Sequence, residues 1–365
     1  MKRIYLAGAC LAFGTGCVFA QSSVTLYGVT DLSVQYLTHA NRTGDSLVRM
    51  TTGGLSQSLL GLRGFEDLGG GYKAVFRMES LFDANTGQQD SPNNFWTVSY
   101  LGVTSPTYGT VTLGRQVSAI ADIVTRTYAS NSWAPYVYVF RPEVTFFAGT
   151  WSSNMAKYQL RAGNILGEAT YAFGNSVGST SYGSQLTAGI AYLGGAFGAG
   201  AAYSDARDST NGSHSKAWTA GASYTWQSTQ VHLGYFENRL DPNFHTFLNG
   251  YFTPQILAAL KFTDMSSRTM FSAGITQYVG ASTHLAFNYW RTLQTGKTRA
   301  LNGTASQFQL VADYNLSKRT DVYVETNYAL YRGDLIGAQL QGVNALSSAQ
   351  KGTQLGLMAG IRHQF

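Results

Sequence analysis

Hydrophobic and polar residues alternate with a period of two along many segments of this chain. The last thirteen residues place their mostly apolar set on one face: Leu355, Leu357, Ala359, Ile361, His363 and Phe365. Residues 217–226 and 307–316 show the same alternation. Because successive side chains of a β-strand point to opposite faces, the pattern predicts amphipathic strands.

The connections between these strands alternate between short and long. Seven short turns are expected, at 67–71, 105–109, 162–164, 194–195, 227–229, 280–282 and 317–319. Longer, mostly polar stretches lie between them, for example 38–54, 174–184 and 331–352. Seven short turns and eight long loops join sixteen strands. An even number of antiparallel strands, with short turns at one end and long loops at the other, is typical of an outer-membrane barrel.

Composition indicates which face of the strands is covered. Charged residues make up only 12% of the chain, about half of the usual ~25%, yet the mean hydropathy is −0.09. A soluble sandwich would bury the apolar faces, whereas a transmembrane barrel turns them to lipid and its polar faces to a lumen. Aromatic residues near the predicted strand ends favour the barrel. About sixteen strands enclose an aqueous channel.

One segment, 186–203, has no charge and could pass for a membrane helix. Its five glycines make it a poor helix former. A hairpin with Gly194 and Gly195 at its tip explains these glycines better. We therefore expect two further strands here.

The N-terminal residues indicate export. Lys2 and Arg3 precede an apolar run that ends in Val18-Phe19-Ala20, so residues 1–20 are expected to be a cleaved signal peptide and 21–365 one barrel domain. A membrane anchor or a lipoprotein signal at Cys17 fits less well. Without this leader, 23 basic and 19 acidic residues leave a formal charge of +4. No basic cluster indicates nucleic acid as a partner.

The stretch 116–153 is the longest connection and is rich in aromatic and aliphatic residues. Long loops inside compact domains are usually functional. We expect this third loop to fold into the lumen and narrow it; the alternative is a cap over the mouth or on a neighbouring subunit. Its acids are Asp122 and Glu143, and its bases are Arg126 and Arg141.

Strand periodicity also assigns charges to the lumen. Arg63, Arg77 and Glu79 lie opposite apolar neighbours and are expected to point inward. Arg115 shares a face with apolar residues, and we expect the strand to end or bend at Gly114 so that Arg115 reaches the lumen. Arginines facing loop carboxylates would favour anions, although each charge could instead be a solvated group away from the narrowest point. The candidate constriction comprises Arg63, Arg77, Glu79, Arg115, Asp122, Arg126 and Glu143.

Enzymatic chemistry has weak support in the sequence. Residues 174–178 match G-x-S-x-G, but a Gly/Ser loop follows where a nucleophile elbow needs a helix. The six histidines are scattered without metal-ligand spacing. We expect no catalytic residue, metal or cofactor. A barrel-embedded hydrolase built on Ser176, and an adhesin barrel whose outer loops bind a partner, remain as alternatives.

Four segments together resemble the general porins of Gram-negative bacteria, above all their β-proteobacterial branch. They are SVTLYGVTDLSVQY (23–36), LLGLRGFEDLGGGYKAVFRMES (59–80), YLGVTSPTYGTVTLGRQ (100–116) and the terminal GIRHQF. The run around 61–71 is quite specific to this family. The third loop departs from the family, because it is unusually aromatic and less acidic.

The resemblance implies an all-β, 16-stranded antiparallel transmembrane barrel, usually a homotrimer, with the third loop folded into each pore. It implies passive passage of small hydrophilic solutes and ions, often with anion preference, or a channel adapted to one substrate. By matching motifs, Arg63, Arg77 and Arg115 would face Asp122. Phe365 and Ile361 would lie at the membrane interface and form the assembly signal for the barrel-assembly machinery. Outer-membrane lipids and lipopolysaccharide would surround the barrel.

Overall fold

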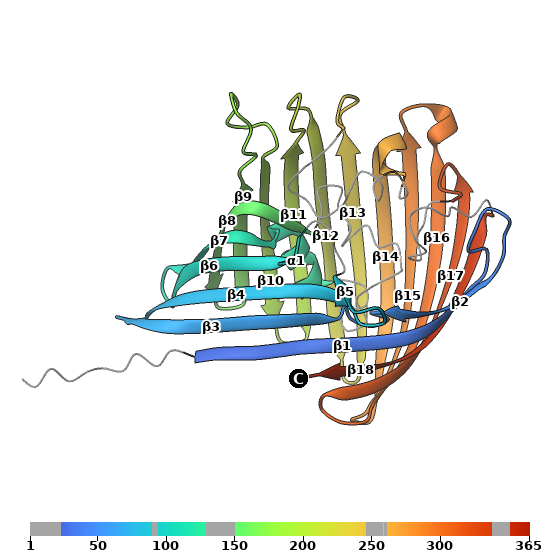
Figure 1. Cartoon of the computed structure of the whole chain (residues 1–365), viewed down its shortest axis with the longest axis horizontal. Coiled ribbons are helices and arrows are strands. Elements are labelled where there is room, and N and C mark those ends of the chain that lie inside the picture. The colour runs from blue at the N-terminus through green and yellow to red at the C-terminus, as the bar shows by residue number, and fades with distance from the viewer. Residues whose placement is uncertain (1–22, 90–93, 129–149, 246–257, 259–260, 338–350) are drawn as a thin grey trace, which may run out of the picture.

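Sixteen antiparallel strands close into a barrel in the computed structural model, which describes residues 23–89, 94–128, 150–245, 258, 261–337 and 351–365 (Figure 1). The barrel strands are β1 (Ser23–Leu37), β3 (Leu59–Gly69), β4 (Tyr72–Asp83), β6 (Val98–Ser105), β7 (Gly109–Val117), β8 (Trp151–Ala162), β9 (Ile165–Ala172), β10 (Gln185–Gly194), β11 (Phe197–Arg207), β12 (His214–Trp226), β13 (Thr229–Leu240), β14 (Met265–Val279), β15 (Thr283–Gly296), β16 (Gly303–Asn315), β17 (Thr320–Gly333) and β18 (Thr353–Gln364). The other described elements lie in connections: β2 (Leu47–Thr52), β5 (Gln88–Gln89), α1 (Ala119–Thr127), η1 (Phe262–Asp264) and η2 (Arg299–Leu301).

The order of the strands confirms the predicted architecture. Each barrel strand pairs with the next, and β18 returns to pair with β1. All seven predicted short turns join consecutive strands. The expected hairpin over 186–203 is formed by β10 and β11. Among the described residues, no helix is long and apolar enough to span a membrane.

Side-chain exposure shows which strand faces turn outward. On β16, Leu310 is 53% exposed whereas its neighbour Gln309 is 2% exposed. β18 likewise exposes Leu357, Ile361 and Phe365. The apolar faces therefore coat the outside of the cylinder and the polar faces turn inward, as the alternation and the composition predict.

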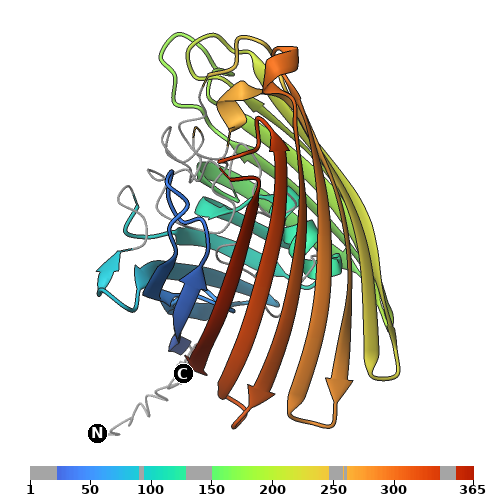
Figure 2. The same cartoon turned by 90° about the vertical axis from the view of Figure 1, so that its right-hand side faces the viewer.

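The C-terminal Phe365 closes the barrel beside β1 (Figure 2). Its backbone N–H and C=O groups exchange two hydrogen bonds with Gly28, each of 3.0 Å. A Cβ atom at Gly28 would lie 2.8 Å from Cε2 of the Phe365 ring. Glycine at this position therefore lets the terminal ring cross the neighbouring strand.

The segment 53–58, between β2 and β3, folds inward instead of continuing the sheet. β1 pairs with β3 through its first half and with β2 through its second half. The Asp31 carboxylate accepts hydrogen bonds from the backbone N–H groups of Leu55 (2.9 Å) and Ser56 (2.8 Å) and from the Tyr323 hydroxyl (2.6 Å). Leu55 is fully buried against Tyr323. The expected polar loop 38–54 thus ends in a second strand and an anchored segment.

Helix α1 is seated on glycines of the inner wall. A Cβ atom at Gly200 would lie 2.7 Å from the side chain of Ile123, and one at Gly234 would lie 2.8 Å from the Tyr128 ring. Gly200, Gly221 and Gly234 stand in register on β11, β12 and β13. Glycine in a strand permits close approach of another chain segment. We call these three residues the glycine row.

The helix begins the long third connection and lies within the ring of strands (Figure 1). It contacts β10, β11 and β12. Its side chains Ile120, Ile123 and Val124 are fully buried there. Residues 129–149 lie outside the described part of the chain, so the inward folding of the complete loop stays a prediction.

Candidate pore constriction

One cluster of charges lies on the inner faces of β1, β3 and β4. The Arg77 guanidinium donates to Glu79 Oε1 at 2.5 Å and to the Tyr27 hydroxyl at 2.9 Å. The Tyr27 hydroxyl donates in turn to Glu79 Oε1 at 2.7 Å. Arg63 pairs directly with Arg77 across the strands, and its Cζ lies 5.1 Å from the Tyr27 ring centroid.

Local sequence explains why this cluster forms. Tyr27 and Gly61 are register partners on β1 and β3. A Cβ atom at Gly61 would lie 2.7 Å from Cε2 of the Tyr27 ring. The missing side chain lets the ring lie across β3, where it contacts both arginines. A tyrosine face attracts such cations.

A second cluster joins α1 to β8 and β9. Lys157 forms ion pairs with Asp122 of α1 and with Glu168, the latter at 3.4 Å, and its Nζ donates to the Val117 carbonyl at 3.2 Å. Arg126 lies one helical turn after Asp122, and its Nε is 3.8 Å from Glu168 Oε1. The lysine therefore ties the first turn of the loop helix to the barrel wall.

A single cavity of ≈ 140 Å³ connects the two clusters. Its lining comes from β4, β6, β7, β8 and α1, so it lies between the wall and the helix. The charged residues among its lining are Arg77, Glu79, Asp122, Arg126 and Lys157. The structure thus brings together four of the residues selected from the sequence, with Arg63 beside Arg77.

The charged side chains at this cavity differ in their exposure to solvent. The Arg77 and Arg126 side chains are 44% and 47% exposed. Of the lining acids, Glu79 is 9% and Asp122 18% exposed; Glu168, which lies outside the lining, is 0% exposed. Asp122 and Glu168 pair with the buried Lys157, whereas Glu79 pairs with the exposed Arg77. The accessible charges at the cavity are therefore predominantly positive.

The place of Arg115 in the constriction stays a prediction. The backbone is irregular beside Gly114, whose φ is 137°, and the pairing of β7 with β8 shifts between Gly114 and Gln116. Gln116 lines the cavity on the same face of β7 as Thr110 and Thr112. Arg115 pairs with Ser99 of β6 and donates to Ser153 Oγ at 2.8 Å. Its side chain is 8% exposed, whereas Leu113 of the same strand is 60% exposed. Arg115 is absent from the cavity lining. Glu143 lies outside the described residues.

Sequence reasoning missed Lys157, Glu168 and Tyr27. Strand parity contained the signal, because Lys157 alternates with the exposed Tyr158 of β8. What the sequence lacked was the distance between β8 and the loop helix.

The Ser176 alternative gains no support. Its hydroxyl donates to the Tyr182 carbonyl at 3.0 Å within the loop between β9 and β10. No histidine is paired with it among the described residues. The loop geometry accounts for this serine without a catalytic role.

Comparisons with known proteins agree with the geometry. A family model described as Gram-negative porin matches residues 7–334. Outer membrane porin protein 32 of Delftia acidovorans is 44% identical over 117 residues, and an outer membrane porin protein of Bordetella pertussis is 35% identical over 131 residues. These matches cover 32% of this chain in each case and 32% and 34% of the relatives, so the chain spans about a third of the length of the curated relatives it matches.

Solved structures extend the likeness over the barrel. The anion-selective porin from Comamonas acidovorans is 27% identical, with a TM-score of 0.74, covering 94% of this chain and all of that one. OmpT of Vibrio cholerae, in a structure described as its trimer form, is 16% identical with a TM-score of 0.65, covering 94% of this chain and 99% of that one, and shows the fold alone. With the family model matched along most of its length and a closed barrel of sixteen strands, the chain belongs to the Gram-negative porins, the barrel proteins of the bacterial outer membrane.

Proposed function

We propose that this porin is a passive outer-membrane channel for small hydrophilic solutes and ions, with a preference for anions. The observation that carries the preference is the unequal exposure of charge: the Arg77 and Arg126 side chains are 44% and 47% exposed, while the lining acids Glu79 and Asp122 are 9% and 18% exposed. Fixed charges that line a narrow passage select permeating ions of the opposite sign. The anion selectivity named for the Comamonas structure supports the same sign.

The direct test is the reversal potential of the refolded protein in a planar bilayer under a KCl gradient. We expect a steady conductance biased toward chloride. Arg126→Gln should reduce this bias by about fivefold. A unit charge ~5 Å from an ion contributes about 0.8 kcal/mol in water, or roughly 0.5 kcal/mol after screening at 0.1 M salt. Because the contribution has opposite sign for anion and cation, the two differ by about 1 kcal/mol.

Lys297→Gln is the matched control, since it removes one positive charge from an exposed loop away from the cavity. A cation-selective wild type would refute the anion preference. Absence of conductance would refute the channel itself.

Several partners belong to the same proposal. The chain assembles as a homotrimer, in contact with outer-membrane lipids and lipopolysaccharide; the OmpT structure described as a trimer form supports this assembly. Residues 1–20 are removed on export, and the strand that carries Ile361 and Phe365 is recognised by the barrel-assembly machinery. Crosslinking of the detergent-purified protein tests the oligomeric state, and mass determination of its mature N-terminus tests the removal of residues 1–20.

A further inference from the structure

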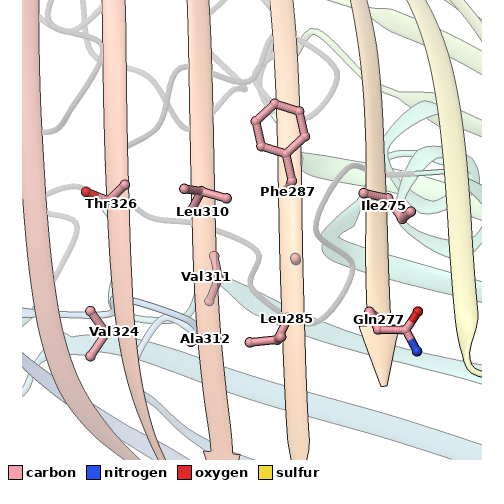
Figure 3. A pocket seen from close by; sticks show the side chains of 10 residues that line it. Ile275, Gln277, Leu285, Phe287, Leu310, Val311, Ala312, Val324 and Thr326 are labelled. Carbon is pink, nitrogen blue, oxygen red and sulfur yellow. The ribbon is translucent and has the colours of Figure 1, made fainter. Parts of the chain in front are cut away.

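An apolar groove of ≈ 520 Å³ crosses the outer surface of four neighbouring strands, β14 to β17 (Figure 3). Gln277 and Thr326 are its only polar lining residues in the part of the chain that the structure describes. The other lining residues are Ile275, Leu285, Ala286, Phe287, Leu310, Val311, Ala312 and Val324. This groove faces the hydrocarbon of the membrane, since the strands expose their apolar faces outward.

The height of the groove follows from one hairpin. Ala312 on β16 pairs with Val324 on β17, and the short turn 317–319 joins these strands. Short turns of such barrels face the periplasm. Arg319 precedes Val324 by five residues, about 17 Å along the strand, or about 13 Å of depth at a tilt of ~40°. Because one leaflet's hydrocarbon is about 15 Å deep, the end of the groove at Ala312 and Val324 lies among periplasmic-leaflet acyl chains and the turn among headgroups.

The turn carries a charge that the other turns lack. All seven short turns lie within the described residues, and only 317–319 contains basic side chains, Lys318 and Arg319. Both are exposed, and within the described chain neither forms an ion pair. The nearest acid along the hairpin, Asp321, is buried and is bound by Arg362 at 3.0 Å. The rim below the groove is therefore positive.

We propose that the groove and this turn together bind an anionic glycerophospholipid of the periplasmic leaflet. One acyl chain fills the groove beneath Phe287, and the headgroup phosphate accepts hydrogen bonds from Lys318 and Arg319. A second copy of the barrel would also fill the apolar groove, and the experiment below distinguishes it from a lipid. A lipid of this leaflet supplies an acyl chain at the depth of the groove and a phosphate at the depth of the turn. This site is independent of the lumen and of the proposed ion preference.

Native mass spectrometry of the delipidated protein, titrated with phosphatidylglycerol or with zwitterionic phosphatidylcholine, tests the proposal. Lys318→Gln combined with Arg319→Gln should weaken phosphatidylglycerol binding about thirtyfold, because each basic residue at an anionic surface contributes about fivefold. The matched control, Lys297→Gln with Arg299→Gln, removes two exposed charges at the opposite end of β15 and β16 and should leave binding unchanged.

Ala312→Phe should fill the groove and reduce the binding of both lipids; if this variant does not fold, Ala312→Leu replaces it. Equal phosphatidylglycerol binding by the wild type and by the Lys318/Arg319 variant would overturn the headgroup assignment. Unchanged binding after the groove is filled would overturn the acyl assignment. Dissociation of the oligomer by the Ala312 variants, without loss of lipid, would assign the groove to a second copy instead.

Discussion

Replacing Lys157 by methionine tests the joint between the loop helix and the barrel wall. The Lys157 side chain is 5% exposed, and its ammonium group forms ion pairs with both Asp122 and Glu168. Methionine keeps much of the volume but leaves Glu168, which is 0% exposed, with only Gln159 (2.6 Å) and the more distant Arg126 as donors. Removing one partner of a buried ion pair costs about 3–5 kcal/mol. We expect Lys157→Met to lower the free energy of unfolding by about that amount.

The double variant Lys157→Met with Glu168→Gln isolates the cause. It removes the charge that the single variant leaves uncompensated, and breaking both members of a buried pair is far less costly than breaking one. Stability should return to within about 1–2 kcal/mol of the wild type. Urea unfolding of the protein refolded into lipid vesicles, followed by tryptophan fluorescence, measures the three free energies. A double variant no more stable than Lys157→Met would refute the reasoning.

Two further predictions concern other contacts inside the barrel. Gly221→Ala places a Cβ atom against the Tyr128 ring and 2.6 Å from a backbone carbonyl; this overpacking, worth about 1–3 kcal/mol, should shift α1 and alter single-channel conductance. Gly167→Ala is the control, because no atom lies within 4 Å of a Cβ added there. Equal single-channel conductance of Gly221→Ala and the wild type would contradict the packing of α1 on the glycine row. Asp31→Ala removes the acceptor of buried amides in the segment 53–58, a loss of about 1–3 kcal/mol for each amide left unsatisfied. Hydrogen exchange at Leu55 should accelerate at least about fivefold, and an unchanged rate would show that Asp31 does not hold the segment.

Much of the fold can be predicted from the sequence because strands and short turns are specified by neighbouring residues. The alternation of β16, with Leu310 outside and Gln309 inside, depends only on the period of a strand. Turn positions follow from glycine and polar residues in the same way. These local signals yield the number of strands, their order and the direction of each face.

The site depends on contacts that no local pattern encodes. Arg115 is buried although Val111 and Leu113, which share its strand parity, are exposed, and strand parity does not predict this difference. Lys157 is 35 residues from Asp122 along the chain, so their ion pair requires the path of the loop. The inward path of segment 53–58 could not be predicted from the sequence either, since Asp31 and Tyr323 come into contact only when the barrel closes.

The selectivity proposed here rests on uncharged residues as well as on arginines. The apolar face of α1 packs on strands whose glycines admit Ile123 and Tyr128 at close range, which fixes the rotation of the helix about its axis. Asp122 and Arg126 are four residues apart and share one helix face. That rotation turns Asp122 toward Lys157 and leaves Arg126 half exposed at the cavity. A side chain in the glycine row would rotate or lift the helix, so three residues without charge decide which charge the permeating ion meets.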